Sequence, residues 1–289
     1  MKPTFKTIDL NQEDSRSLKF LYKNPIGRMF LKILVQPVFS KIGGAVLDSR
    51  LSIPYIQSFI KSNQIQMDRY TEKKYRSFND FFKRELINPP NPQTLDVDTF
   101  YSPCDGKVSV YPITENQSFY IKKSEYRIKD LLQDEALAQE YMNGQMLIFR
   151  LTPDDYHHYA YFDSGQIRSQ KKIKGVLHTV RPISLEQENV YIRNAREVTV
   201  METAHFGLVT QIEVGALLVG KIVNLKDAGA FNAFEKKGYF EFGGSTIILL
   251  FKENSVELST ELIDNTQKDQ ESIVKLGDKL GTRMEPKNA

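Results

Sequence analysis

The sequence predicts an α+β fold in which a helical N-terminal region precedes a mostly antiparallel β domain. Apolar residues before residue 88 follow helical spacing, whereas short β-like runs dominate after residue 97. Between them, Asn88-Pro89-Pro90-Asn91-Pro92 predicts a linker, because proline cannot continue a helix and also restricts the residue before it. We therefore expect a helical region and linker over residues 1–97 and a β-rich domain over residues 98–289.

Length and composition are those of an ordinary globular protein. The 289 residues are 40% hydrophobic and 26% charged, and their net charge of +3 is too small to indicate a nucleic-acid partner. The single cysteine, Cys104, excludes an internal disulfide and fits a reducing compartment. The N-terminus lacks the apolar core of a secretory signal, and no run approaches the ~18 apolar residues of a spanning helix. We expect a protein that is soluble or sits on a membrane surface.

Helices are expected in three places before the linker. Apolar residues from Leu18 to Leu34 recur at helical spacing, and Asn24-Pro25 divides this stretch into two helices. A further helix is expected from Ile53 to Ile60, and another from Asn79 to Leu86 behind Ser77, a residue type that caps helices.

The first helical stretch has two interpretations. It packs on the β domain, as amphipathic helices usually do. Alternatively, its apolar face enters a membrane surface while Lys19, Lys23, Arg28 and Lys32 meet anionic headgroups. Composition alone favours packing on the β domain.

The β domain is expected to contain strands at its short apolar runs. Gly, Asn and Asp separate these runs at short intervals, which favours antiparallel connections. A helical segment is expected to interrupt them over Ile128–Asn143. The expected strands are Lys107–Tyr111, Met146–Leu151, Val198–Met201, Leu208–Val214 and Ile247–Phe251.

Ser245 is the candidate nucleophile. It follows Gly243-Gly244 and opens the last of these strands. Because glycine permits backbone geometries closed to other residues, the Gly244 carbonyl can bend toward the Ser245 hydroxyl. That arrangement suits a serine that attacks its own peptide bond. A bulge or tight turn at the start of a core strand is the commoner meaning of an isolated motif of this kind.

Three further segments place polar groups among apolar residues. Asp105 lies in a Pro/Gly turn, His157 and His158 follow Asp155-Tyr156, and His178 stands between apolar residues. No Cys or Glu stands at a ligand spacing from the paired histidines, so we predict no metal site. An acid, a base and a nucleophile are thus available in the chain order Asp, His, Ser, a set that unrelated folds can assemble.

Taken together, these segments resemble the phosphatidylserine decarboxylases over nearly the whole chain. No single piece is decisive, but six pieces in the family's order are a strong signal. They are Ser77–Arg84 (SFNDFFKR), the Ser-Pro-x-Asp-Gly turn at Asp105, Asp155-Tyr156-His157, Asn194-x-Arg196, Glu213–Gly220 (EVGAxxVG), and Lys237-Gly238-Tyr239-Phe240 with Gly243-Gly244-Ser245-Thr246.

The chain departs from the family's pattern at two positions. Many members have Leu-Gly before the serine where this chain has Gly243-Gly244, a change that keeps the cleavable Gly-Ser bond. The family often has a second histidine three positions after the one that matches His157, and this chain has Ala160 there. We hypothesise that His157 or His178 is the base for self-cleavage.

The resemblance implies a proenzyme that cleaves itself at Gly244–Ser245. Asp105 would orient and stabilise a histidine cation, and that histidine would take the proton of the Ser245 hydroxyl. Attack on the Gly244 carbonyl and β-elimination would leave a pyruvoyl group derived from Ser245. Residues 1–244 and 245–289 would then be the larger and smaller subunits of an associated heterodimer.

The resemblance also implies the reaction, the cofactor and the location. The pyruvoyl carbonyl would form a Schiff base with the amine of phosphatidylserine and accept electrons as CO2 leaves. His157 would protonate the resulting carbanion, and hydrolysis would release phosphatidylethanolamine. A lipid substrate also favours Leu18–Ile42 as a membrane-facing element of a peripheral protein on the cytoplasmic side of the cell membrane.

Two alternatives to an active enzyme stay open on the sequence. Val274–Gly281 and Gly215–Lys221 are similar to the turns of biotinyl- and lipoyl-type sandwich domains, which are non-enzymatic binding modules. Such domains present a modified lysine in a tight turn, and no clear hairpin of that kind is present. Ala160 is the reason to consider an inactive relative that does not cleave itself.

Overall fold

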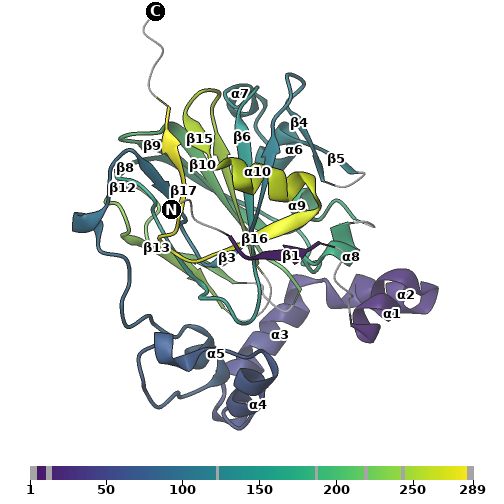
Figure 1. The fold of residues 1–289 in the computed structure, drawn as a ribbon. Helices are drawn as coiled ribbons and strands as arrows, with labels where there is room; N and C mark the ends of the chain where they lie inside the picture. The colour runs from purple at the N-terminus through teal and green to yellow at the C-terminus, as the bar shows by residue number, and fades with distance from the viewer. Residues whose placement is uncertain are drawn as a thin grey trace, which may run out of the picture.

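A nine-stranded antiparallel sheet forms the centre of the computed structural model, which describes residues 5–10, 15–121, 124–185, 188–217, 221–241 and 245–284 (Figure 1). Each neighbouring pair of strands in this sheet is antiparallel. In spatial order the strands are β1 (Thr7–Asp9), β16 (Gln270–Val274), β3 (Gly106–Pro112), β6 (Gln145–Leu151), β14 (Ser245–Phe251), β10 (Gly207–Val214), β9 (Arg196–Thr203), β8 (Gly165–Ile173) and β12 (Gly229–Phe231).

Smaller sheets cover the central one. Two of them have three strands each and enclose a core with one face of the large sheet, whereas a two-stranded hairpin lies on the opposite face. Their strands are β11 (Ile222–Asn224), β13 (Lys236–Phe240) and β7 (His158–Ala160); β15 (Val256–Leu258), β17 (Lys279–Arg283) and β2 (Thr99–Tyr101); and β4 (Ser118–Ile121) with β5 (Ser124–Arg127).

Strand β14 is buried along its whole length, because both faces of the sheet are covered at its position. Successive side chains of a strand point to opposite faces. Ile247 and Leu249 accordingly enter the core under the small sheets, and Ile248 and Leu250 enter the core on the other face. Complete burial of an aliphatic side chain contributes about 1.5–3 kcal/mol to stability. The uninterrupted apolar run is therefore the sequence of a central strand.

Helices and short 3-10 turns occupy the N-terminal region, and later helices pack against both faces of the large sheet. In Figure 1 the first five helices lie below the sheet domain, with α3, α4 and α5 forming one lobe. The N-terminal elements are α1 (Arg16–Lys23), α2 (Pro25–Leu34), α3 (Pro37–Asp48), η1 (Arg50–Ser52), α4 (Tyr55–Ser62), η2 (Met67–Arg69), α5 (Phe78–Phe82) and η3 (Pro92–Thr94). The later helices are α6 (Ile128–Leu132), α7 (Glu135–Gln139), α8 (Pro182–Leu185), α9 (Val190–Arg193) and α10 (Thr260–Gln267).

The predicted helix boundaries are confirmed where side chains cap them. Asn24 ends α1 and caps α2, because its amide oxygen accepts hydrogen bonds from the backbone N–H groups of Ile26 and Gly27. Ser77 caps α5 as expected. That helix ends at Phe82, before the predicted Leu86, because Leu86 pairs instead with Tyr70 in an isolated β-bridge. The expected helical segment at 128–143 is two short helices, separated where Gln133 adopts a left-handed conformation.

All five predicted strands are present, whereas the N-terminal segment differs from its prediction. Residues expected in a helical region begin with strand β1, which forms the edge of the large sheet beside β16. Three residues are too few to show a helical or an alternating pattern, so the sequence carries no signal for this strand.

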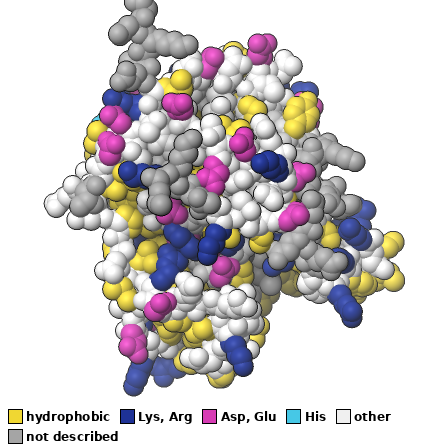
Figure 2. All heavy atoms as spheres, in the orientation of Figure 1, with side chains coloured by type: hydrophobic (Ala, Val, Ile, Leu, Met, Phe, Trp, Pro, Cys, Tyr) yellow, Lys and Arg dark blue, Asp and Glu magenta, His cyan; other side chains and the backbone are white. Residues whose placement is uncertain are grey.

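The N-terminal helices leave an apolar surface uncovered. Side chains of α2 and α3 that are at least 40% exposed include Ile26, Met29, Phe30, Ile33, Val38, Phe39, Ile42 and Val46. At the right-hand end of Figure 2, where α1 and α2 lie in Figure 1, apolar side chains stand next to Lys and Arg side chains. None of the described helices is long and apolar enough to cross a membrane alone. Helices α2 and α3 together have sufficient length and apolar composition, but they are bent by 70° at their junction.

Tyr22 attaches α1 to the sheet domain. Its ring is buried, and its hydroxyl accepts a hydrogen bond from the Thr179 backbone N–H at 3.1 Å. The same hydroxyl lies 3.2 Å from His178 Nδ1. Since the hydroxyl oxygen already accepts from Thr179, its own proton is free to be donated to His178.

Tyr22→Phe is expected to loosen the helical region. The change leaves Thr179 N–H and His178 Nδ1 without this partner and should lower the free energy of unfolding by about 1–2 kcal/mol. Trypsin should also release the basic N-terminal helices faster than in the unchanged protein. Tyr120→Phe is the matched control, because Tyr120 is more than half exposed. Equal stability and proteolysis in the two variants would contradict the attachment.

Candidate active site

Ser245 opens β14 at the edge of the buried core. It is the Cα partner of Leu151, the last residue of β6, and it is 0% exposed. Its hydroxyl has no hydrogen-bond partner within the described part of the chain. Gly243 and Gly244, which precede Ser245 at the predicted cleavage site, lie outside the described residues.

The fold brings His157 to the same end of the sheet as Ser245. The chain runs from Leu151 at the end of β6 to His157, whose carbonyl accepts a hydrogen bond from Phe240 N–H at 3.0 Å. Phe240 ends β13, and five residues later the chain reaches Ser245, opposite Leu151. Leu151 lies opposite Ser245, and His157 is hydrogen-bonded to Phe240. Both candidate residues are therefore held in the same part of the structure. The His157 ring is fully buried against Phe82, with ring centroids 4.0 Å apart.

The hydrogen bonding of His157 makes it a proton acceptor. Its Nδ1 lies 3.0 Å from the backbone oxygen of Asp155, and because a carbonyl only accepts, Nδ1 carries the proton. Nε2 therefore has a free lone pair and no partner among the residues described. Burial, together with the positive charge of Arg84, lowers the pKa of His157 to about 3. The imidazole is neutral near pH 7.

Asp105 does not contact a histidine side chain in the described residues, in contrast to the role expected from the sequence. Its carboxylate is fully buried and accepts hydrogen bonds from Arg69 Nη1 at 3.0 Å and from Leu276 N–H at 2.9 Å. Lys275 Nζ lies 3.0 Å away. These donors occupy the carboxylate, and the Asp155 carbonyl orients His157 instead. A catalytic role for Asp105 stays a prediction.

A second buried carboxylate shares the same cations. Asp155 lies 2.8 Å from Lys107 Nζ and 3.2 Å from Lys275 Nζ, and it accepts a hydrogen bond from Thr152 N–H. Burial alone would raise its pKa, but Lys107 and Lys275 lower the pKa of Asp155 to about 2. The two carboxylates and their three cations, Arg69, Lys107 and Lys275, are called the ion cluster below.

The ion cluster is built from three separate parts of the chain. Arg69 ends η2 in the N-terminal region, and Lys107 lies on β3 beside Asp105. Lys275 follows β16, downstream of Ser245. Burial lowers the pKa of Lys275, but the neighbouring Asp105 and Asp155 outweigh it and raise that pKa overall. These ion pairs therefore tie the segment after Ser245 to the segments before it.

The other histidines near the site have structural contacts. His158 Nε2 donates to the Lys83 backbone oxygen at 3.2 Å, and its ring stacks on Tyr156 with centroids 4.9 Å apart. Its Nδ1 is buried without a hydrogen-bond partner among the described residues, and the family motif matches His157, not His158. His178 is buried between Tyr22 and Asn194, and burial lowers its pKa. Ala160 sits in β7 and has no titratable side chain to offer.

A buried polar cluster lies on the Ser245 side of the sheet, and it contains Glu213 and Lys237, which belong to the family motifs but received no role from the sequence. Glu213 is the cross-strand partner of Ile247, whose side chain shares a face with Ser245. Lys237 Nζ lies 2.8 Å from Glu213 Oε1, and both side chains are almost wholly buried. Asn224 donates to Glu213 at 3.1 Å and accepts from Lys237 at 2.7 Å. The sequence signal for this cluster was the carboxylate of Glu213 inside the predicted strand Leu208–Val214.

No three His, Cys, Asp or Glu side chains come together as a possible metal site in the residues that the structure describes. The cations of the site are all lysine or arginine side chains. The buried charges of the site are therefore balanced by protein groups of opposite sign.

Lys237→Met should be strongly destabilising because it leaves Glu213 charged and buried. We expect a loss of about 3–5 kcal/mol in the free energy of unfolding, with much of it recovered in the Glu213→Gln, Lys237→Met double variant. Lys236→Met is the control, since Lys236 pairs with Glu85 on the surface and should contribute about 0–1 kcal/mol. Denaturant unfolding measures all three; additive losses in the double variant would refute a coupled pair.

Comparisons with known proteins agree on one family. The model of the family described as phosphatidylserine decarboxylase matches residues 78–282. A protein of Clostridium acetobutylicum named phosphatidylserine decarboxylase proenzyme 2 is 44% identical over 271 residues, which cover 93% of each chain. Proteins named phosphatidylserine decarboxylase proenzyme from Ruminiclostridium cellulolyticum and Clostridium novyi are 37% and 36% identical, covering 96% and 92% of this chain and 94% and 92% of their own.

Proposed function

Because this chain belongs to the phosphatidylserine decarboxylase family, we propose that it is a self-cleaving proenzyme that converts phosphatidylserine to phosphatidylethanolamine and CO2. One observation carries the proposal. A serine hydroxyl and an imidazole nitrogen, Ser245 Oγ and His157 Nε2, are buried at the same end of the sheet without hydrogen-bond partners among the described residues. A hydroxyl proton to give up and an imidazole lone pair to receive it are the groups that nucleophilic attack by a serine requires.

Self-cleavage follows from the groups present. His157 Nε2 takes the Ser245 hydroxyl proton, and the oxygen attacks the Gly244 carbonyl carbon. The peptide C–N bond breaks as an ester forms, and the nitrogen takes a proton. Loss of the Ser245 α-proton then expels the Gly244 carboxylate and leaves a dehydroalanine. Water replaces its nitrogen, which departs as ammonia, and a pyruvoyl group remains on the new N-terminus.

The surroundings of Ser245 fit such a group. It would stand at the start of β14, held between β6 and β10 by the strand ladders and buried from solvent. A pyruvoyl group supplies an electrophilic carbonyl for the amine of phosphatidylserine and an electron sink for the loss of CO2. His157, neutral and buried beside Phe82, is the proposed proton carrier to and from the reacting carbon.

The two chains made by cleavage would stay associated. The proposed smaller subunit, 245–289, contributes β14 between β6 and β10 and β16 between β1 and β3. Lys275 of this segment also pairs with Asp105 and Asp155 of the larger one. The cut therefore crosses a continuous sheet, whose hydrogen bonds and core hold the heterodimer together.

Self-cleavage should depend on Ser245 and His157. Intact-mass analysis of the unchanged protein should give chains of residues 1–244 and 245–289, the smaller blocked by pyruvoyl, while Ser245→Ala stays whole. His157→Gln should slow cleavage by about 100-fold or more. Because His157 is neutral down to about pH 3, the unchanged rate should not titrate between about pH 6 and 8.

His158→Gln and His178→Gln are matched controls that remove one imidazole each and should cleave at near the unchanged rate. Normal cleavage of the His157→Gln variant together with no cleavage of the His178→Gln variant would identify His178 as the base. A single intact chain from the unchanged protein, with no phosphatidylethanolamine made from phosphatidylserine, would favour a binding module or an inactive relative.

We further propose that α2 and α3 hold the protein on a membrane surface. Their exposed apolar side chains alternate with exposed Arg28, Lys32 and Lys41, the composition of a helix that lies in a lipid interface. Adjacent Lys19 and Lys23 on α1 add positive charge that anionic headgroups attract. A lipid-modifying enzyme needs contact with the bilayer surface that holds its substrate.

The membrane contact is tested with point substitutions, because deletion of residues 1–42 would also remove β1 and Tyr22. Met29→Gln, Phe30→Gln and Ile33→Gln together should reduce flotation with phosphatidylglycerol-containing vesicles by about tenfold or more. The control carries Val97→Gln, Tyr120→Gln and Leu225→Gln, three similarly exposed positions elsewhere. Equal flotation of the two triple variants would exclude this surface.

A further inference from the structure

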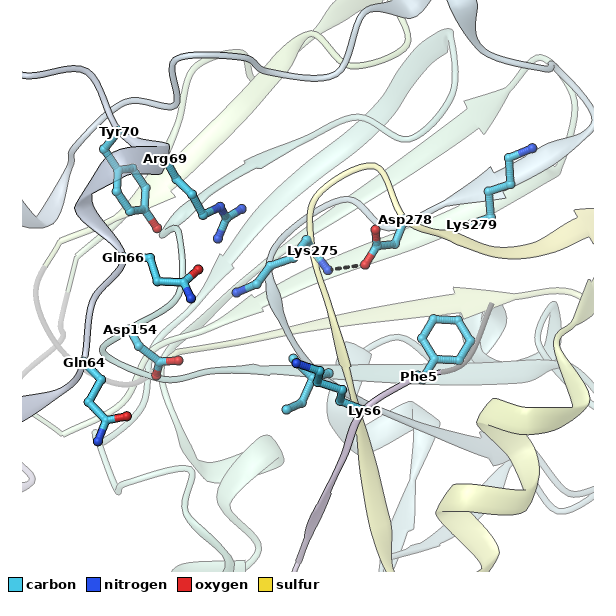
Figure 3. Close-up of a pocket in the computed structure, with 11 residues that line it drawn as sticks. Phe5, Lys6, Gln64, Gln66, Arg69, Tyr70, Asp154, Lys275, Asp278 and Lys279 are labelled. Carbon is cyan, nitrogen blue, oxygen red and sulfur yellow. Dashed lines mark hydrogen bonds between the residues drawn. The ribbon is translucent and has the colours of Figure 1, made fainter. Parts of the chain in front are cut away.

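A cavity of about 680 Å³ opens between the N-terminal region and the sheet domain (Figure 3). Its walls come from the two residues before β1, from the segment around η2, from Asp154 after β6, and from β16, β17 and the turn between them. Neither Ser245 nor His157 lines it. The cavity is therefore separate from the site assigned to self-cleavage. It is lined by Phe5, Lys6, Gln64, Gln66, Arg69, Tyr70, Asp154, Ile273, Lys275, Asp278 and Lys279.

The lining is rich in hydrogen-bond donors and carries excess positive charge. Four of its side chains are cations and two are carboxylates. Asp154 is already engaged by Lys107 and Thr152, and Asp278 accepts a hydrogen bond from the Lys275 backbone N–H at 2.7 Å. Gln64 and Gln66 add amide groups. The two lining carboxylates thus have partners of their own. Of the lining cations, Arg69 and Lys275 pair with Asp105 outside the lining, whereas Lys6 and Lys279 have no ion-pair partner among the described residues.

Individual cations have donors to spare. Lys6 makes no side-chain hydrogen bond or ion pair with any residue in the described ranges. Arg69 uses Nη1 for Asp105, and its Nη2 and Nε have no partner in the same ranges. Figure 3 shows Lys275 extending toward Arg69 and Gln66, whereas Lys279 points away from the centre of the cavity. Lys6 therefore supplies an unpaired charge, and Arg69 supplies spare N–H donors beside its ion pair with Asp105. Lys275, which pairs with Asp105 and Asp155, extends its ammonium group toward them.

The cavity is joined to the ion cluster through two shared residues. Arg69 and Lys275 line the cavity and also hold Asp105, 3.0 Å from each. An anion in the cavity would meet the outer donors of these two side chains while their inner contacts reach the buried carboxylate. Since the cations come from either side of the proposed cleavage site, such an anion would also bridge the two subunits.

We propose that this cavity binds a phosphate group. A phosphate offers several acceptor oxygens and a charge of one to two, which matches the spare guanidinium N–H groups of Arg69 and the ammonium groups of Lys6 and Lys275. A lipid headgroup and a soluble phosphomonoester both carry this chemistry. Binding stabilises the joint between the N-terminal region, the sheet domain and the segment after Ser245.

The binding is measured on the uncleavable Ser245→Ala protein, so that the result does not depend on the proposed decarboxylation. Titration calorimetry with inorganic phosphate at constant ionic strength should show binding, and phosphate should raise the melting temperature. Lys6→Gln should weaken the affinity about tenfold, the effect of one charged hydrogen bond. Lys279→Gln is the matched control, because it removes the same charge from a side chain that points away.

Arg69→Lys is a second variant that keeps the charge toward Asp105 but loses the spare N–H groups, and it too should weaken binding. Absence of phosphate binding in the Ser245→Ala protein, or equal losses in Lys6→Gln and Lys279→Gln, would overturn the proposal.

Flotation with phosphatidylcholine vesicles, with and without phosphatidylglycerol, distinguishes the two sources of phosphate. Competition by inorganic phosphate together with weaker flotation of Lys6→Gln assigns the cavity to a lipid headgroup. Phosphate binding that Lys6→Gln weakens, with flotation unchanged, assigns it to a soluble phosphomonoester. Both outcomes support a phosphate site and differ only in its ligand.

Discussion

The burial of two carboxylates, Asp105 and Asp155, is the constraint on which the assembly of this protein depends. An ionised carboxylate without partners is too costly to bury, so its counter-charges must be present whenever the fold is. Here they are Arg69, Lys107 and Lys275, which come from the N-terminal region, the sheet domain and the segment after Ser245. Docking of each part completes the ion cluster. The same ion pairs therefore tie both the N-terminal region and the segment after Ser245 to the sheet domain.

The position of Ser245 shows why a strand suits a residue that is proposed to become a cofactor. Its backbone neighbours are fixed by ladders to β6 and β10, and side chains on both faces of β14 are packed in separate cores. A break at its N-terminal side would remove one covalent bond and leave those contacts in place. Rigid support of this kind keeps a reacting group in position more accurately than a loop does.

The histidines show why the sequence alone could not decide which imidazole is the base for self-cleavage. His157, His158 and His178 all stood in polar segments, and the family resemblance singled out His157 without excluding His178. In the structure, a backbone carbonyl places the proton of His157 on Nδ1 and leaves Nε2 open. His158 donates to the Lys83 carbonyl, and His178 is bonded to Tyr22. These partners lie 75 and 156 residues away in the chain, beyond the reach of any local pattern.

The sequence by itself determined the α+β class, the five central strands, the capped helices at Asn24 and Ser77, and Ser245 as the candidate nucleophile. These depend on local patterns: the alternation or continuity of apolar residues, capping side chains and short motifs. Tertiary structure alone decided that Asp105 faces Arg69 and Lys275 rather than a histidine, that Glu213 and Lys237 form a buried pair, and that β1 joins the sheet. Each of these contacts joins residues that are far apart in the sequence. Such residues meet only because the packing of the cores brings their segments together.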